Sequence, residues 1–177
     1  MIYEPEEDSF LLKYQIEKFV EKGTKVLDMG TGSGILAQEA KECGGKVLAA
    51  DINPDAIKLC KTMGIKAVIS DLFENIPKNT KYDLIIFNPP YLPRDELEDE
   101  ESAVITSGGE KGNEIIEKFL KQAKNFLSKK GKLLFLVSSL TPETENILKE
   151  NGYTFEKVSE KNIFFEKLIV YSAWVQE

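Results

Sequence analysis

Histidine is absent from this chain of 177 residues. Without it, the protein cannot form a Ser-His-Asp triad, a zinc site with histidine ligands or an imidazole general base, which excludes several classes of hydrolase. Cysteine is scarce as well, because Cys43 and Cys60 are the only two and their spacing matches neither a zinc knuckle nor a redox CxxC pair. We therefore predict no metal site and two reduced, partly buried thiols.

The sequence also lacks a long apolar run. The longest ones, Leu84–Phe87 and Leu133–Val137, are far shorter than the roughly 18 residues that cross a bilayer. The N-terminal residues are acidic where a signal peptide would be basic. A composition of 42% hydrophobic and 30% charged residues is typical of a globular protein. We expect one domain over residues 1–177, a cytoplasmic location and no membrane partner.

Positive charge is in deficit. The chain has 23 Lys and Arg residues against 30 Asp and Glu residues, its formal net charge is −7, and Arg94 is its single arginine. Binding to nucleic acid without sequence preference depends on cationic side chains that release counterions from phosphates. This charge therefore predicts that the protein has no direct nucleic-acid partner.

From residue 24 onward, short apolar runs alternate with amphipathic stretches, which predicts an α/β fold with helices flanking a parallel sheet. The expected strands are Lys25–Met29, Lys46–Ala50, Ala67–Ser70, Tyr82–Phe87 and Lys132–Ser138. The expected helices span residues 35–43, 55–63, 113–127 and 143–151. Two of them are predicted to begin with an N-cap followed by proline, at Asn53-Pro54 and Thr141-Pro142. The predicted helix stops are Gly44, Gly64, Gly131 and Gly152.

Both ends of the chain depart from this alternation. Apolar residues recur at helical spacing near the N-terminus, so a helix over residues 8–21, within an N-terminal cap segment of residues 1–22, is expected to cover one edge of the site. Residues 153–175 predict an antiparallel hairpin that turns at residues 160–162. Residues 92–112 show no periodicity and are predicted to form a substrate loop.

A glycine-rich turn follows the first expected strand. Gly30, Gly32 and Gly34 alternate in Asp28-Met29-Gly-Thr-Gly-Ser-Gly, and glycine permits both a tight turn and the close approach of a ligand to the backbone. Asp51 ends the next strand, about 20 residues further on, where a carboxylate can accept both hydroxyls of an adenosine ribose. Together, the turn and the acid predict a site for an adenosine-containing ligand.

The ligand that fits this turn is cationic. The turn lacks the GxGxxG spacing of pyrophosphate sites, and Asp28 would lie beside the phosphates of a dinucleotide. S-adenosylmethionine carries a sulfonium and an α-amino group, and we expect Asp28 near its amino-acid end. Asp71 is predicted to bind the adenine amino group, unless it is only a turn cap, and Leu72 to contact the ring. Ile52, next to Asp51, is assigned to the same cofactor site.

The fourth expected strand ends at Asn88-Pro89-Pro90-Tyr91. Two prolines fix φ at about −65° and remove two N–H donors, which leaves a rigid loop with free carbonyls. We predict that Asn88 and the Pro89 carbonyl accept hydrogen bonds from a planar NH2 group that stacks on Tyr91. This geometry draws the nitrogen toward a tetrahedral shape and frees its lone pair to attack a methyl group, with no strong base. A stiff exit turn is the alternative.

Together, these motifs resemble the class I S-adenosylmethionine-dependent methyltransferases, from about residue 24 to the C-terminus. The resemblance implies a Rossmann-like, seven-stranded, mostly parallel sheet in the order 3-2-1-4-5-7-6, with an antiparallel C-terminal hairpin and helices on both faces. The Asn-Pro-Pro-Tyr loop is similar to that of amino-methyltransferases acting on glutamine amides and on adenine N6.

Two further segments resemble the short archaeal and eukaryotic HemK-type glutamine N5-methyltransferases, which modify the GGQ glutamine of class I release factors. Residues 3–12, YEPEEDSFLL, are similar to the opening of that branch, and residues 107–112, SGGEKG, to its GGxxG loop. The resemblance implies that Pro5 and Ser9 help to close the cofactor pocket, that Asn88 also contacts the cofactor, and that Asn88 and Tyr91 hold the glutamine.

The same resemblance implies a small zinc-binding activator protein as a partner. Ile65, Val68 and Ile69 are expected to form the exposed strand edge that binds it, and an ordinary, partly buried edge strand is the alternative. Arg94, three residues after Tyr91, is predicted to hold backbone carbonyls of the substrate, and a solvated ion pair with its acidic neighbours is the alternative.

Three other functions remain open. An adenine N6-methyltransferase of DNA or RNA could use the same Asn-Pro-Pro-Tyr loop, but the net charge of −7 argues against it. A lysine methyltransferase would need a base for the protonated amine rather than two acceptors. A non-catalytic subunit with the same fold would have no need of an intact acceptor loop.

Overall fold

The computed structural model describes residues 2, 5–91 and 108–176. The helices are α1 (Glu7–Ile16), α2 (Ile35–Glu42), α3 (Pro54–Thr62), α5 (Glu114–Ala123) and α6 (Thr144–Glu150). The strands are β1 (Lys25–Met29), β2 (Lys46–Asp51), β3 (Lys66–Ile69), β4 (Tyr82–Phe87), β5 (Leu127–Ser138), β6 (Tyr153–Ile163) and β7 (Glu166–Val175). They form one sheet in the order β3-β2-β1-β4-β5-β7-β6, and β7 is antiparallel to both neighbours. The predicted sheet is confirmed.

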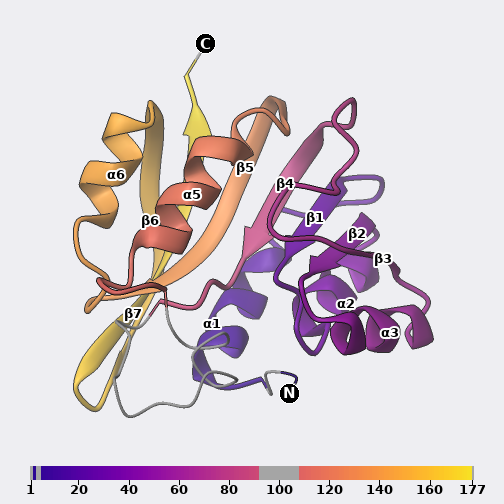
Figure 1. Ribbon diagram of the computed structural model, residues 1–177, viewed down its shortest axis with the longest axis horizontal. Helices are drawn as coiled ribbons and strands as arrows, with labels where there is room; N and C mark the ends of the chain where they lie inside the picture. Colours follow the sequence, from indigo (N-terminus) through magenta and orange to yellow (C-terminus); the bar gives the residue numbers. More distant parts are fainter. Residues whose placement is uncertain (1, 3–4, 92–107, 177) are drawn as a thin grey trace.

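Helices cover both faces of this sheet (Figure 1). Successive side chains of a strand point to opposite faces, so Val26 of β1 belongs to one buried cluster with Leu36 of α2, whereas Leu27 belongs to another with Phe119 of α5. The near-continuous apolar sequence of β4 follows from this arrangement, because a central parallel strand is buried on both faces. None of the helices in the described ranges has the length and apolar composition needed to cross a membrane.

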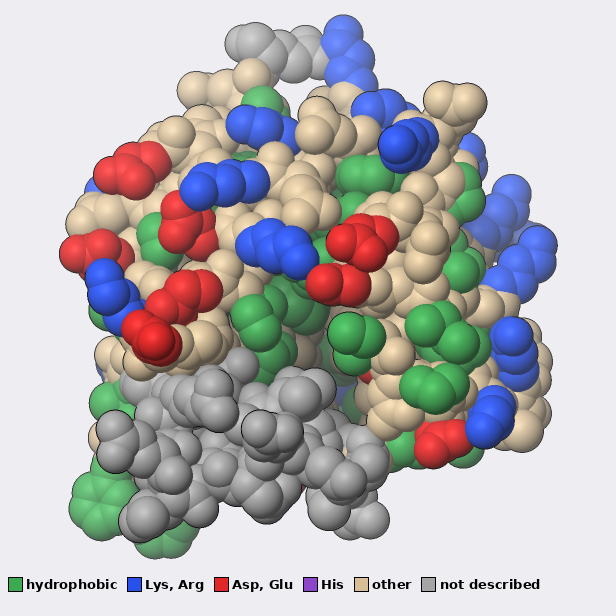
Figure 2. Space-filling model, viewed as in Figure 1, with side chains coloured by type: hydrophobic (Ala, Val, Ile, Leu, Met, Phe, Trp, Pro, Cys, Tyr) green, Lys and Arg blue, Asp and Glu red, His purple; other side chains and the backbone are tan. Residues whose placement is uncertain are grey.

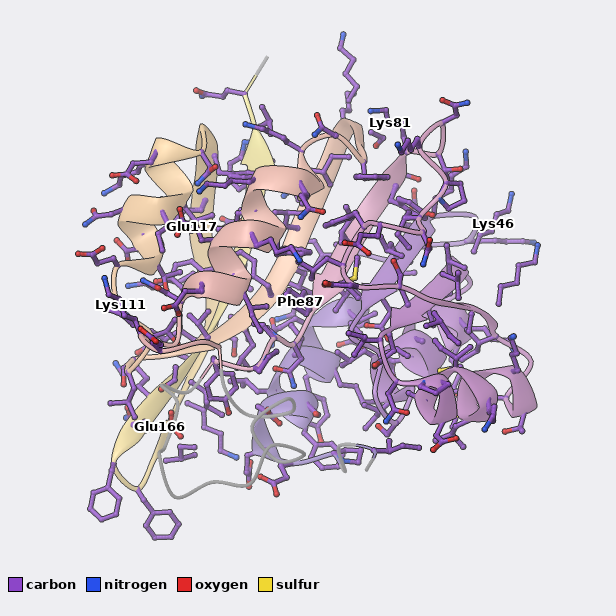
Figure 3. All side chains as sticks on the ribbon, in the orientation of Figure 1. Lys46, Lys81, Phe87, Lys111, Glu117 and Glu166 are labelled. Carbon is purple, nitrogen blue, oxygen red and sulfur yellow. The ribbon has the colours of Figure 1, made fainter. Side chains whose placement is uncertain are left out.

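The register of the parallel strands brings their carboxyl ends to one edge of the sheet. Met29 of β1 is paired with Ala50 of β2 and with Phe87 of β4, and Asp51 is paired with Ile69 of β3. Figure 3 shows Phe87 at this end of β4 and Lys81 beyond the opposite end. The chain leaves β1 toward β2 on one side and returns as β4 on the other, which is where a crevice forms in such sheets.

Several predicted helix boundaries were wrong. The first helix ends at Ile16 rather than at residue 21, and the N–H groups of Phe19 and Val20 close a turn onto the Ile16 carbonyl. The helix predicted over residues 113–127 ends at Ala123, because Leu127 already pairs with Tyr82 across the sheet. Gly131 therefore lies inside β5 and is not a helix stop, unlike Gly44, Gly64 and Gly152, which follow helices with positive φ.

The predicted start of the last helix was also wrong. That helix begins at Thr144, its N-cap is Glu143, and the N-cap makes no side-chain hydrogen bond. Instead of capping the helix, Thr141 donates its hydroxyl to the Tyr91 carbonyl at 3.2 Å. The other predicted start is confirmed, because the Asn53 side chain accepts a hydrogen bond from the Asp55 N–H, with Pro54 at the first helical position.

The C-terminal hairpin turns later in the sequence than predicted. Residues 160–162 pair with β7, so the turn lies at Phe164 and Phe165. Both phenyl rings are almost fully exposed, and Figure 2 shows apolar side chains projecting at this tip of the hairpin. A charged and polar sequence such as Glu160-Lys161-Asn162 is typical of a turn, but here these residues are the exposed residues of β6, an edge strand.

The predicted apolar edge is present only in part. β3 is an edge strand of the sheet, Ile69 is 49% exposed and Val68 is partly exposed. Ile65, however, is buried among Ala37, Ala49 and Cys60, so its predicted exposure was wrong. It precedes β3 and faces α3 rather than the open edge.

The packing of α5 predicts a large cost for removing Phe119. Its side chain is fully buried, and its ring centroid lies 4.5 Å from that of Phe87 and 5.6 Å from that of Phe73. Phe119→Ala should lower the free energy of unfolding by roughly 3–5 kcal/mol because it leaves a cavity. Phe164→Ala, at an exposed position, should change it by less than about 0.5 kcal/mol in the same urea titration. Equal effects of the two substitutions would contradict the assigned core.

Candidate active site

The glycine-rich turn is tied to the end of β2 by Asp51. Gly30, Gly32 and Gly34 all have positive φ, a backbone conformation that is strained for residues with a side chain. The N–H of Gly32 donates to one carboxylate oxygen of Asp51 at 2.8 Å, and the N–H of Asn53 donates to the other, also at 2.8 Å. Each oxygen keeps a lone pair beyond these bonds. Asp51 is thus held rigidly at the mouth of the turn and can still accept two hydroxyls.

Asp28 is the most perturbed acid of the described chain. Its side chain has no exposed surface, Thr31 donates its hydroxyl to Oδ2 at 2.6 Å, and Oδ1 has no hydrogen-bond partner among the described residues. Burial raises the pKa of Asp28 to about 7, and the Thr31 hydrogen bond opposes the shift while the nearby Asp51 adds to it. A direct contact between Asp28 and a ligand stays a prediction.

The end of β3 forms a strained corner. Leu72 has a φ of 45° and is almost fully buried, and the Ser70 hydroxyl donates to its carbonyl at 2.7 Å. Asp71 is half-exposed and forms an ion pair with Lys118 of α5 at 3.1 Å. Ile52, at the end of β2, is also exposed. Asp71 and Leu72, predicted to bind the adenine, and Ile52, assigned to the same cofactor site, therefore follow the ends of adjacent strands.

The Asn-Pro-Pro-Tyr loop follows β4 directly and meets the start of α1. Asn88 donates its side-chain amide hydrogens to Asp8 Oδ2 at 3.1 Å and to Ser9 Oγ at 3.5 Å. Its carbonyl oxygen is buried with no hydrogen-bond partner in the described part of the chain. Pro89 is buried, and Tyr91 donates its hydroxyl to Asp8 at 3.5 Å. The loop thus presents an unused acceptor from a fixed side chain.

Tyr91 is held in its neutral form. Burial raises the pKa of its phenol well above the usual range, and the negative charges of Asp8 and Glu166 act in the same direction. Glu166 lies at the start of β7, and Figure 3 shows it low on the hairpin, at the same end of the sheet as Phe87. Acidic groups from α1 and from β7 near Tyr91 make this end of the site electronegative.

Asp8 is a site residue that sequence reasoning missed. An acid in the first turn of a helix usually stabilises the helix dipole, so nothing in the pattern set it apart from Glu7. The structure separates the two, because Asp8 is 4% exposed and contacts the loop, whereas Glu7 faces outward and pairs with Lys161. Pro5, predicted to close the pocket, is partly buried just before α1.

The described end of the predicted substrate loop packs against Asn-Pro-Pro-Tyr. Gly108 is buried, and a Cβ built there would lie 2.8 Å from the Pro90 carbonyl oxygen and 2.4 Å from that of Gly112. Only glycine fits at such a distance. Arg94 and Ser107 lie outside the described residues, as does the rest of the loop over residues 92–107.

A separate hollow of about 320 Å³ lies between the end of β5, α6 and the hairpin, lined by residues such as Ser138, Thr141 and Tyr171. None of the predicted cofactor residues lines it. The hollow adjoins the site through Thr141, whose hydroxyl bonds to the Tyr91 carbonyl. The predicted site itself is the row of strand ends at Gly30, Asp51 and Asn88.

This row of strand ends, on a sheet of this order, can be compared with known proteins. The sequence model described as the methyltransferase small domain matches residues 8–166. The chain belongs to this methyltransferase family. The match runs from α1 through the glycine-rich turn and the Asn-Pro-Pro-Tyr loop to the first residue of β7, and it confirms the predicted class of enzyme.

Individual relatives confirm the predicted branch. A Methanocaldococcus jannaschii protein, provisionally named a protein N5-glutamine methyltransferase, is 40% identical over 98% of this chain and 91% of its own. Human methyltransferase HEMK2 is 35% identical over 84% of this chain and 76% of its own. The E. cuniculi Mtq2 structure, a complex with Trm112 described as responsible for methylating the eRF1 translation termination factor, has a TM-score of 0.81 at 27% identity and covers 99% of both chains.

The raised pKa of Asp28 predicts how stability varies with pH. An acid whose pKa is higher in the folded state destabilises that state as pH rises from the unfolded value, about 4, to the folded value of about 7. Asp28→Asn removes this titration. The difference in free energy of unfolding, variant minus wild type, should therefore increase between pH 5 and pH 7 and level off above pH 8.

Urea titrations at four pH values measure this difference. A difference that is constant with pH for Asp28→Asn would show that Asp28 is ionised normally in the folded protein.

Proposed function

We propose that this protein transfers a methyl group from S-adenosylmethionine to the side-chain amide nitrogen, N5, of a protein glutamine, and that its substrate is the GGQ glutamine of a class I release factor. One observation carries the proposal: the side-chain carbonyl oxygen of Asn88, the residue that precedes Pro89 and Pro90, is buried and has no partner among the described residues. Two acceptors at this point suit an uncharged NH2 group.

The names of relatives support the same substrate. Besides the M. jannaschii protein, a Clostridium acetobutylicum release factor glutamine methyltransferase is 30% identical over 84% of this chain and 60% of its own. The E. cuniculi complex is described as acting on a translation termination factor. The printed names refer to a protein glutamine, to a translation termination factor, or to both, which favours a protein amide over adenine or lysine as the methyl acceptor.

The residues at the strand ends fit S-adenosylmethionine. When bound, it supplies a methyl group activated by a positively charged sulfur. The unpartnered Oδ1 of Asp28 and the charge of Asp51 make the turn electronegative, which suits a cation. Asp51 would accept the ribose hydroxyls, Asp71 the adenine amino group, and Leu72 and Ile52 would contact the ring. Gly30, Gly32 and Gly34 leave the backbone accessible.

At the other end of the site, Asn88 and the Pro89 carbonyl orient the substrate amide. Each accepts one N–H bond, and the lone pair of the nitrogen then points away from both toward the methyl donor. Such preorganised acceptors act mainly as charge develops on the nitrogen. Tyr91, neutral because its pKa is raised, offers a flat wall without removing a proton. The proton leaves to water after the methyl group has been transferred.

We place a small zinc-binding activator at the edge of β3, and we expect the enzyme to work in the cytoplasm. The edge strand exposes Ile69 and part of Val68, which can pair with and pack against another chain. The E. cuniculi relative is described as a complex with Trm112, which supports a partner subunit. No direct role for nucleic acid is proposed.

The function is tested with methyl-labelled S-adenosylmethionine and a purified class I release factor, with and without the activator protein. Mass spectrometry should place one methyl group on the GGQ glutamine, and a release factor with that glutamine replaced by asparagine should remain unlabelled. Labelling of a lysine, or labelling of cell extract that RNase abolishes, would contradict the proposal.

Asp51→Ala should weaken binding of S-adenosylmethionine, because it removes charge-assisted hydrogen bonds to the ribose that are worth roughly 1.5–3 kcal/mol, or about 10- to 150-fold in Kd. Calorimetry measures the change. The control is Asp55→Ala, which removes an exposed acid paired with Lys58 on the neighbouring helix and should leave Kd unchanged. Equal Kd values for the two variants would mean that Asp51 does not bind the ribose.

Asn88→Ala should reduce kcat by at least about a hundredfold while Kd for S-adenosylmethionine changes by less than about fivefold, because the acceptor acts chiefly in the transition state. Single-turnover kinetics and calorimetry separate the two effects. A variant that retains a tenth of the wild-type turnover would rule out the two-acceptor mechanism.

A further inference from the structure

One buried carboxylate holds both ends of the Asn-Pro-Pro-Tyr loop. Asp8 and Asn88 are 80 residues apart in the sequence, yet Asp8 Oδ2 accepts hydrogen bonds from the Asn88 amide at 3.1 Å and from the Tyr91 hydroxyl at 3.5 Å. The other oxygen accepts the N–H of Ser9. Because α1 packs against β5, β6, β7 and α2, this carboxylate is anchored to the body of the protein.

The chemical consequence lies in the symmetry of an amide. The oxygen and the NH2 group of Asn88 have nearly the same size, so rotating the side chain by half a turn exchanges an acceptor for a donor with almost no change of shape. A carboxylate can only accept, and its hydrogen bond to an N–H is about twice as strong as a neutral one. Asp8 therefore favours the rotamer in which the NH2 group faces Asp8 and the oxygen faces the site.

We propose that Asp8 is a positioning residue that makes the enzyme select a side-chain amide over a carboxylate. The inference rests on the proposed function, in which Asn88 contacts the substrate. With Asn88 held by Asp8, the site offers two acceptors, Asn88 Oδ1 and the Pro89 carbonyl, which bind the NH2 group of glutamine and repel the carboxylate of glutamate. With Asn88 rotated, the NH2 group would face the site, oppose glutamine and attract glutamate.

The neighbouring acid on the same helix turn provides a matched control. Glu7 faces the opposite direction, where it forms an exposed ion pair with Lys161 of β6. Glu7→Gln and Asp8→Asn both remove one negative charge from the first turn of α1. A general effect of charge on this helix would appear in both variants, whereas an effect on Asn88 would appear only in Asp8→Asn.

The test compares wild type, Asp8→Asn, Asp8→Ala and Glu7→Gln. The readouts are kcat and KM with the release factor, and the Kd of the S-adenosylhomocysteine-loaded enzyme for the release factor and for its version with the GGQ glutamine changed to glutamate. In Asp8→Asn, which has the same shape, the side-chain NH2 group must face either the NH2 group of Asn88 or the N–H of Ser9. In either orientation, two hydrogen-bond donors face each other. We expect kcat to fall at least about tenfold and the preference for glutamine over glutamate to fall at least about tenfold. Glu7→Gln should keep both within about twofold.

A complementary substitution provides a rescue. Asn88→Asp alone brings two carboxylates together and should be poorly active. In the Asp8→Asn background, the introduced carboxylate presents an acceptor to the site in either rotamer, and it can accept a hydrogen bond from the amide at position 8. The double variant should recover at least about tenfold in kcat over Asp8→Asn.

The outcomes separate this inference from the function on which it rests. If Asn88→Ala turns over normally, the proposed site fails. If Asn88→Ala is inactive while Asp8→Asn keeps its kcat and its preference for glutamine, only the role of Asp8 is overturned. A loss in Asp8→Asn that leaves the preference intact and is not relieved in the double variant also overturns it, because that pattern belongs to a residue that only stabilises the fold.

Discussion

The parallel pairing of β1 with both β2 and β4 is the constraint on which the rest of the molecule depends. It aligns Met29, Ala50 and Phe87, so that the residues after each strand emerge side by side. It also leaves the ends of these strands exposed to a ligand, because the chain departs from β1 in one direction and returns on its other side. The glycine-rich turn, the acid after β2 and the acceptor loop after β4 are functional together only because this register holds.

The site is rich in acids, and each is held by a different donor. Asp28 is bonded by Thr31, Asp51 by two backbone N–H groups, and Asp71 by Lys118. The negative charge of the fully buried Asp28 is costly unless a positive ligand compensates it. In the proposed reaction the sulfonium loses its charge when the methyl group leaves, so the same field that favours the substrate cofactor contributes less to holding the neutral product.

The sheet order and the rows of site residues could be predicted because they depend on local signals: alternating apolar runs, glycines at a strand end, and prolines after Asn88. The wrong boundaries depend on tertiary pairing. Residues 127–131 read as the end of a helix until Leu127 is seen to pair with Tyr82, and Glu160 reads as part of a turn until β7 is placed beside it. Asp8 could not be recognised because its partner, Asn88, follows the end of β4 and is 80 residues away in the sequence.

The position of β7 has a consequence for biosynthesis. β7 follows β6 in the sequence but lies between β5 and β6 in the sheet. A ribosome releases the chain from its N-terminus, so the inner edges of β5 and β6 have no partner until residues 166–175 have emerged. Open strand edges are templates for pairing with other chains. The charged residues spaced along β6, such as Lys157 and Glu160, then serve the nascent protein as well as the mature one, because they oppose aggregation while the central strand is still missing.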